Sequence, residues 1–147
     1  MAFYTDIHTT KRFRLGTTKA DIAGNVYVYL QGVASLAAKD VVLFDEAGVT
    51  TRSLAATIGQ VAVSMAANTS TTNYSWFQVY GMVTGVPVLT SFADNSAIYT
   101  TSTPGSVDDS GAGAEEFVFG MWGRSAIASG VATMQLAYPF KHAATLD

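Results

Sequence analysis

Short stretches rich in β-branched and aromatic residues recur along this chain, separated by turn residues at spacings of about 8–12 residues. Between them no helical period is sustained over about ten residues, so the pattern predicts an all-β protein. The expected strands are Lys11–Leu15, Asn25–Gln31, Asp40–Phe44, Thr57–Met65, Asn73–Gly81, Ala97–Thr101, Glu116–Trp122 and Val131–Tyr138. Short connections favour antiparallel pairing, and we therefore expect a single-domain antiparallel β-barrel or β-sandwich.

The segment Asn73–Gly81 is the densest aromatic segment of the chain and is expected to be a central strand. Side chains alternate along a strand, so Trp76 and Tyr80 are expected on one face and Phe77 on the other. Both faces are largely apolar, which predicts a strand that is covered on both sides. We expect the strand to break at residues 85–87, where glycine and proline occur together.

Two later strands are expected to alternate in the same way. In Glu116–Trp122 the pattern places one set of side chains opposite another, namely Phe117, Phe119 and Met121 against Val118 and Trp122. In Val131–Tyr138 the inward side chains are expected to be Ala132, Met134, Leu136 and Tyr138. These patterns define much of the predicted core.

The length of 147 residues predicts one domain with a substantial core. Residues 1–20 are expected to form an N-terminal arm with a first short strand, and residues 21–147 the β-domain. Charged residues make up only 13% of the chain, and Ser53–Ala93 contains no Asp, Glu, Lys, Arg or His. Polar residues interrupt that run before about 18 apolar residues accumulate, so no transmembrane helix and no membrane partner are expected. No apolar segment follows the basic N-terminal residues, which predicts synthesis and retention in the cytoplasm.

The residue types that support catalysis are sparse. The chain has no cysteine, which excludes disulfides and thiolate chemistry. Its two histidines, His8 and His142, lie near opposite ends and neither neighbours a glycine-flanked serine. No phosphate-binding glycine loop is present. We therefore expect a protein that is not an enzyme and uses no cofactor.

Four carboxylates gather around a glycine-containing loop, at Asp108, Asp109, Glu115 and Glu116. A calcium loop needs oxygen ligands at alternating positions around a sharp turn, and adjacent acids do not supply that spacing. A solvated acidic loop is the expected structure, with no metal site.

Half of the eight basic residues lie near the N-terminus, at Lys11, Arg12, Arg14 and Lys19. Together with Phe13 they could contact nucleic acid, since clustered cations neutralise phosphates and single-stranded bases stack on aromatic rings. The net charge of −3 opposes general attraction to nucleic acid. A salt-bridged contact with another protein is the favoured interpretation, and no nucleic acid partner is expected.

The largest aromatic side chains are expected in the core or at a subunit interface. They are Trp76, Phe77, Tyr80 and Trp122. The alternative is a β-barrel binding module, in which Trp76, Tyr80 or Trp122 contacts a glycan or a small apolar ligand.

Several segments resemble the small β-rich head decoration (cement) proteins of tailed bacteriophages. The similar segments are Gly24–Leu30, Asp40–Phe44, Ile58–Val63, Asn73–Gly81, Ala97–Asp109, Val131–Thr133 and Ala137–Phe140. Each is a short structural pattern, and together they span most of residues 24–140. Another phage component, such as a tail or spike domain, would share the same fold argument.

The resemblance implies a virion structural protein that sits on the capsid exterior, commonly as a homotrimer, and clamps neighbouring copies of the major capsid protein. Its N-terminal arm would contact the capsid, with these residues in that role: Phe3, Tyr4 and Phe13 as apolar anchors, and Lys11, Arg12 and Arg14 as the basic contacts. The charge-poor run Ser53–Ala93 would fit burial between like subunits, because interface cores are depleted of charge.

Overall fold

The computed structural model describes residues 3–111 and 115–141. These residues form a single all-β domain, as expected, with eleven strands in one antiparallel sheet and one 3-10 turn, η1 (Phe3–Thr5). The strands are β1 (Ile7–His8), β2 (Thr18–Ala20), β3 (Val26–Gln31), β4 (Val41–Phe44), β5 (Thr50–Arg52), β6 (Gly59–Ser64), β7 (Tyr74–Pro87), β8 (Ala97–Thr100), β9 (Val107–Asp108), β10 (Phe117–Gly123) and β11 (Val131–Lys141). None of the described residues forms a helix of the length and apolar character that a bilayer crossing requires.

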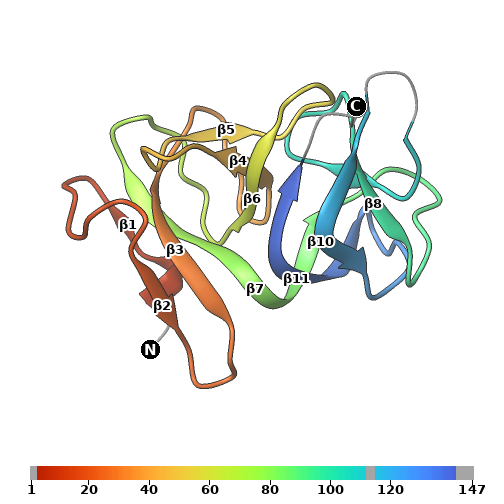
Figure 1. The fold of residues 1–147 in the computed structure, drawn as a ribbon, viewed down its shortest axis with the longest axis horizontal. Helices are drawn as coiled ribbons and strands as arrows, with labels where there is room; N and C mark the ends of the chain where they lie inside the picture. The colour runs from red at the N-terminus through yellow and green to blue at the C-terminus, as the bar shows by residue number, and fades with distance from the viewer. Residues whose placement is uncertain (1–2, 112–114, 142–147) are drawn as a thin grey trace.

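The long strand β7 connects the two halves of the molecule (Figure 1). The sheet follows the order β2-β3-β7-β6-β11-β10-β8-β9, and β7 pairs directly with β1, β3, β6 and β11. Its first half lies among β1 to β6, and its second half pairs with β11 from Tyr80 to Pro87. A strand of 14 residues can span both halves because it rises about 3.3 Å per residue.

The sheet curls at both ends without closing. A bridge between Gln31 and Val49 brings the chain before β5 next to β3, and a bridge between Val88 and Val107 brings β9 next to the end of β7. These contacts give each half its own curved sheet, and the sheet as a whole remains open. The predicted antiparallel all-β domain is confirmed. The two finer alternatives, a barrel and a sandwich, describe this single open sheet only loosely.

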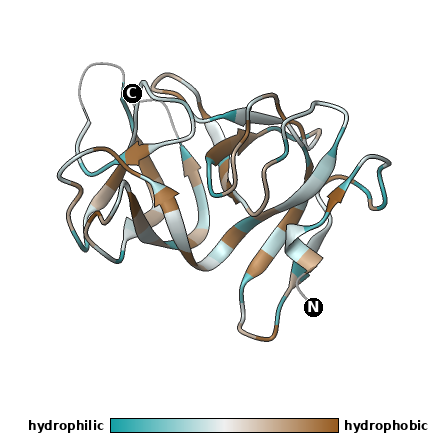
Figure 2. Ribbon diagram, turned by 180° about the vertical axis from the view of Figure 1, so that it is seen from behind, coloured by the Kyte–Doolittle hydropathy of each residue, from teal (hydrophilic) through white to brown (hydrophobic). Residues whose placement is uncertain are grey.

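The core lies on both faces of the β3–β7 pair, as the sequence predicts. Tyr29 and Trp76 point into a large cluster that continues into the second half, whereas Leu30 and Phe77 point into a smaller cluster with β4 and β6. Brown and pale bands follow one another along β7 (Figure 2). Residues 75–79 are all buried, and buried and exposed residues alternate from Tyr80 to Thr84, as expected for a strand with one covered face.

The structure differs from the sequence-based prediction at two strand boundaries. β7 continues through Gly85 to Pro87, because residues 85–87 follow the irregular pairing with β11 and Gly85 adopts a φ of 79°. Lys11–Leu15 is not a strand. This segment is instead the connection between β1 and β2, the strands that pair with β7 and β3.

The predicted alternation in β10 is wrong after Phe119. The register between β10 and β11 shifts between Phe119 and Met121, and Gly120 adopts a φ of 74°. An additional residue at a bulge reverses which side chains face the core. Met121 is therefore buried beside Val118, and Trp122 is exposed on the same side as Phe119.

The predicted inward position of Tyr138 is also wrong. Tyr138 has a φ of 50° and lies where β11 is out of regular register with β10, between Leu136 and Phe140. The left-handed backbone turns its side chain outward, and 58% of the residue is exposed. The other three predicted inward residues, Ala132, Met134 and Leu136, are buried.

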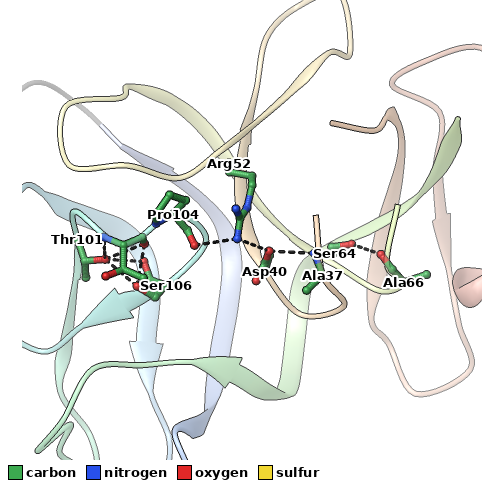
Figure 3. A network of polar contacts seen from close by, with 9 residues as sticks. Ala37, Asp40, Arg52, Ser64, Ala66, Thr101, Pro104 and Ser106 are labelled. Carbon is green, nitrogen blue, oxygen red and sulfur yellow. Dashed lines mark hydrogen bonds and ion pairs between the residues drawn. The ribbon is translucent and has the colours of Figure 1, made fainter. Parts of the chain in front are cut away.

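A buried ion pair joins the two halves of the molecule at Asp40 (Figure 3). The Asp40 Oδ2 atom accepts hydrogen bonds from the Ala37 backbone N–H and from Arg52 Nη2, both at 3.0 Å. Arg52 Nη2 also donates to the Pro104 carbonyl at 3.0 Å. The network thereby attaches β4 and β5 to the turn before β9.

Gly105 makes this network possible, and replacing it with alanine is expected to lower the free energy of unfolding by about 3 kcal/mol. Gly105 has a φ of 82°, and a Cβ atom there would lie 2.7 Å from Asp40 Cγ. Gly130 has nearly the same φ, 81°, with nothing within 4 Å of its Cβ position, so Gly130→Ala should cost only about 1 kcal/mol. Urea unfolding of both variants measures the difference, and equal losses would contradict the role of the Asp40 contact.

Candidate interaction surface

The three aromatic residues predicted as N-terminal anchors pack against their own domain. The Phe3 ring meets the Tyr27 and Trp76 rings edge to face, with centroid distances of 5.5 and 5.4 Å. The Tyr4 ring stacks on Tyr27 at 4.8 Å. Residues 1–20 were expected to form an arm, and β3 and β7 of the same chain contact these aromatic rings.

Phe13 completes this N-terminal aromatic cluster. Its ring lies 5.2 Å from Tyr29 and 5.4 Å from Trp76, and the Lys19 ammonium lies 5.7 Å from its centroid. His8 is half-buried, with Nδ1 2.7 Å from the Tyr29 hydroxyl. Burial raises the pKa of the Tyr29 hydroxyl. His142, the other histidine considered, lies outside the described residues.

The basic residues of the same segment point the other way. Lys11, Arg12 and Arg14 are exposed, and none of them forms an ion pair with a residue in the described part of the chain. The six residues expected to act together are thus divided. The rings stabilise the domain, and the cations remain available to another molecule.

The four large aromatic residues singled out in the sequence are divided in a similar way. Trp76 and Phe77 are 1% and 0% exposed and belong to the core. Tyr80 and Trp122 are about 40% exposed, at 41% and 38%. Trp76 therefore offers no surface to a glycan.

A row of exposed phenylalanines crosses β10 and β11. The Phe117 and Phe119 rings meet at 4.7 Å, and Phe119 stacks on Phe140, its direct partner across the strand pair, at 5.1 Å. Tyr99 extends the row onto β8, with its ring 5.6 Å from Phe117. Sequence reasoning did not assign Phe117, Phe119 or Phe140 to a surface. The spacing of Phe117 and Phe119 by two residues indicates that they share one face of a strand, but it does not indicate whether that face is exposed.

Two further groups lie on these strands. Gln135 pairs with Trp122 on one neighbouring strand and with Met82 on the other, and directly opposite residues share a face of the sheet. The Tyr80 and Tyr138 rings meet at 5.4 Å. We refer to the exposed residues of β7, β10 and β11 as the aromatic surface: Tyr80, Met82, Phe117, Phe119, Trp122, Tyr138 and Phe140.

Beside the aromatic surface lie two adjoining hollows of about 760 and 300 Å³. Both are lined by Phe44, Asp45, Glu46 and Gln60, and we call them together the acidic groove. The larger hollow reaches Phe140 and the smaller reaches Tyr138. The smaller one is also lined by Val28, Leu30 and Val79. The lining is therefore partly apolar, and the two acidic residues lie where the hollows meet.

Among the described residues that line the acidic groove, the one cation is Lys141, and its charge is held by other partners. The Lys141 side chain is fully buried, and its Nζ atom donates to the backbone carbonyls of Ala55 at 2.6 Å and Leu54 at 3.3 Å. Glu116 Oε2 lies 3.9 Å from Nζ. Burial lowers the pKa of the Lys141 ammonium, and the Glu116 carboxylate acts in the opposite direction. The charges that remain accessible in the groove are Asp45 and Glu46.

The predicted acidic loop is only partly solvated. Glu116 faces Lys141, and Asp109 accepts a hydrogen bond from the Ala93 backbone N–H at 2.9 Å. Burial raises the pKa of the Asp108 carboxyl. Within residues 3–111 and 115–141, no three histidine or acidic side chains are grouped as metal ligands would be. The aromatic surface and the acidic groove together form an apolar contact surface with a few exposed charges.

Comparison with models of known protein families, with curated protein sequences and with solved structures finds no match for this chain.

Proposed function

We propose that this chain is a non-enzymatic structural protein that binds the outside of a phage capsid and stabilises neighbouring major capsid subunits. The observation that carries the proposal is the aromatic surface. Its exposed rings include Phe117, Phe119 and Phe140, which contact one another on strands that are paired on both sides. Contiguous exposed apolar patches of this kind mark interaction sites, and aromatic residues are enriched in interfaces.

The resemblance to head decoration proteins directs the proposal to a capsid rather than to another partner. It lies in segments that the structure uses as strands, including Asp40–Phe44 and Asn73–Gly81. A decoration protein acts by mass action, because binding only the assembled shell stabilises that shell. Several copies around one symmetry axis, as in a homotrimer, would multiply modest contacts into tight binding.

The structure changes which residues we assign to capsid contact. Phe3, Tyr4 and Phe13 contact the rings of Tyr27 and Trp76. Detaching them to bind a capsid would expose those buried rings to water. The aromatic surface needs no such rearrangement, since its rings are already exposed. We therefore place the main capsid contact on β10 and β11, and leave the exposed N-terminal cations for a neighbouring protein.

Phe119→Asp is expected to weaken binding to capsids by about 30-fold or more, because a buried interface aromatic contributes about 2 kcal/mol or more. The measurement is co-sedimentation with capsids of the encoding virus that were prepared without this protein. Ile22→Asp is the matched control, because Ile22 is fully exposed and apolar but lies in the β2–β3 turn, away from the aromatic surface. Far-UV circular dichroism of both variants checks that the fold is retained.

The proposal fails if the wild-type protein does not co-sediment with capsids. It also fails in its assignment of the surface if Ile22→Asp and Phe119→Asp weaken binding equally. Heads that lack the protein are expected to rupture at lower temperature, because the additional contacts between subunits are absent.

A further inference from the structure

The acidic groove has accessible carboxylates without cationic partners. Asp45 Oδ1 accepts hydrogen bonds from the backbone N–H groups of Ala47 and Val49, both at 3.0 Å, which fixes the turn and leaves Oδ2 open. Glu46 is exposed at the next position. Neither carboxylate forms an ion pair with a residue in the part of the chain that the structure describes.

The walls around these carboxylates are apolar and open. Ile58 is 62% exposed and Phe140 is 44% exposed, and both line the larger hollow together with Phe44. An aromatic ring next to a carboxylate suits a guanidinium group, which pairs with the acid and stacks on the ring. The apolar stem of an arginine would also cover exposed carbon atoms. The groove therefore has the chemistry of a site for arginine side chains.

The same chain carries arginines that lack partners. Arg12 and Arg14 are exposed, and their segment is fixed in place because the Arg12 backbone N–H donates to the Tyr29 hydroxyl at 3.3 Å. The segment ends beside the groove, since Leu15 Cβ lies 2.6 Å from the position that a Cβ on Gly48 would occupy. The end of the basic segment thus lies beside the turn that carries Asp45 and Glu46.

We propose that the acidic groove is the binding site for Arg12 and Arg14 of a second copy of this chain. Each copy carries both halves of the contact, so a rotation about an axis beside them brings the basic segment of one copy onto the groove of the next. The exposed Ile58 supplies apolar area for the contact, and the charges fix its orientation. This inference rests on the proposed function, because it identifies the surface by which a decoration protein would self-associate.

A charge exchange tests the contact. Glu46→Lys and the double variant Arg12→Glu/Arg14→Glu each place like charges together, and each is expected to raise the concentration for half-association by about 10-fold or more. The triple variant Arg12→Glu/Arg14→Glu/Glu46→Lys places one cation opposite the reversed segment while Asp45 stays acidic, so it should recover at least about 3-fold of the association that the double variant loses. Asp94→Lys is the matched control, since Asp94 is exposed and lies outside the groove.

Sedimentation velocity over a concentration series at low and high salt gives these values. The supporting result is association that weakens with salt, is lost in both charge reversals and returns in the triple variant. The inference is overturned if the wild type stays monomeric, if the triple variant remains as weak as its parents, or if Asp94→Lys weakens association as much as Glu46→Lys.

The outcome can be separated from that of the proposed function. Salt-dependent association restored by the charge exchange, without binding to capsids, would support this contact and reject the decoration role. Binding to capsids by a protein that is monomeric in solution would support the decoration role and reject this contact.

Discussion

Trp76→Ala is expected to lower the free energy of unfolding by about 3–5 kcal/mol, the range for removing a fully buried tryptophan. Trp76 is 1% exposed, and its ring lies 5.1 Å from Tyr29 and 5.4 Å from both Phe3 and Phe13. The loss is expected to exceed that of an aliphatic core residue, because Phe3 and Phe13 of the N-terminal segment both pack on this ring. Urea unfolding followed by far-UV circular dichroism measures the change.

The second tryptophan provides the control. Trp122 is 38% exposed on β10, so Trp122→Ala should change the free energy of unfolding by no more than about 1 kcal/mol. If Trp76→Ala left stability close to that of Trp122→Ala and removed binding of a ligand instead, Trp76 would be a binding residue and its assignment to the core would be wrong. The β-barrel binding module would then regain support.

Lys141→Met is the second change with a large expected effect, a loss of about 3–5 kcal/mol. The variant keeps most of the apolar stem but leaves the Glu116 carboxylate, 3.9 Å from Nζ, as a charge without its partner. The two carbonyls that Lys141 contacts have other donors, since Thr57 Oγ1 donates to Leu54 and Thr100 Oγ1 to Ala55. Most of the cost is therefore attributed to Glu116.

A double-mutant cycle checks that attribution. Glu116→Gln combined with Lys141→Met removes both charges and should recover at least about half of the loss, whereas additive losses would contradict an interaction between the two groups. The pH dependence is a second test. Because burial lowers the folded-state pKa of Lys141, the unfolded state binds its proton more tightly below about pH 10.4, so this residue makes stability rise with pH toward that value. Lys141→Met should remove that contribution to the slope.

Much of the local structure was predictable because strand formation follows a short-range pattern. The segments around Val26, Val41, Gly59 and Tyr74 alternate with period two or are continuously apolar, and all of them form strands. The coverage of both faces of Tyr74–Gly81 was likewise predictable from its composition. Lys11–Leu15 was expected to be a strand and is not, because Ile7–His8 pairs with β7 instead, and a short local pattern does not report that pairing.

The candidate interaction surface was less predictable. The exposure of Trp122 and Tyr138 depends on the bulge at Gly120 and on the left-handed backbone at Tyr138, each of which reverses the alternation that the sequence implies. The acidic groove depends on bringing Asp45 and Glu46 next to Phe140, almost a hundred positions further along the chain. A local sequence pattern cannot predict a contact between residues so far apart in the chain.

The sequence by itself determined that this chain forms an all-β domain with an apolar central strand, because alternation and turn residues act over a few positions. Only the tertiary structure decided which aromatic residues became core and which became surface. Phe3 and Tyr4 pack against the core through β3 and β7, whereas Phe117, Phe119 and Phe140 stayed outside on β10 and β11. Phe13 lies between these cases, because its ring contacts Tyr29 and Trp76 while 38% of the residue stays exposed. The physical reason is that burial depends on strand register and long-range pairing, and a single bulge is enough to exchange the two faces of a strand.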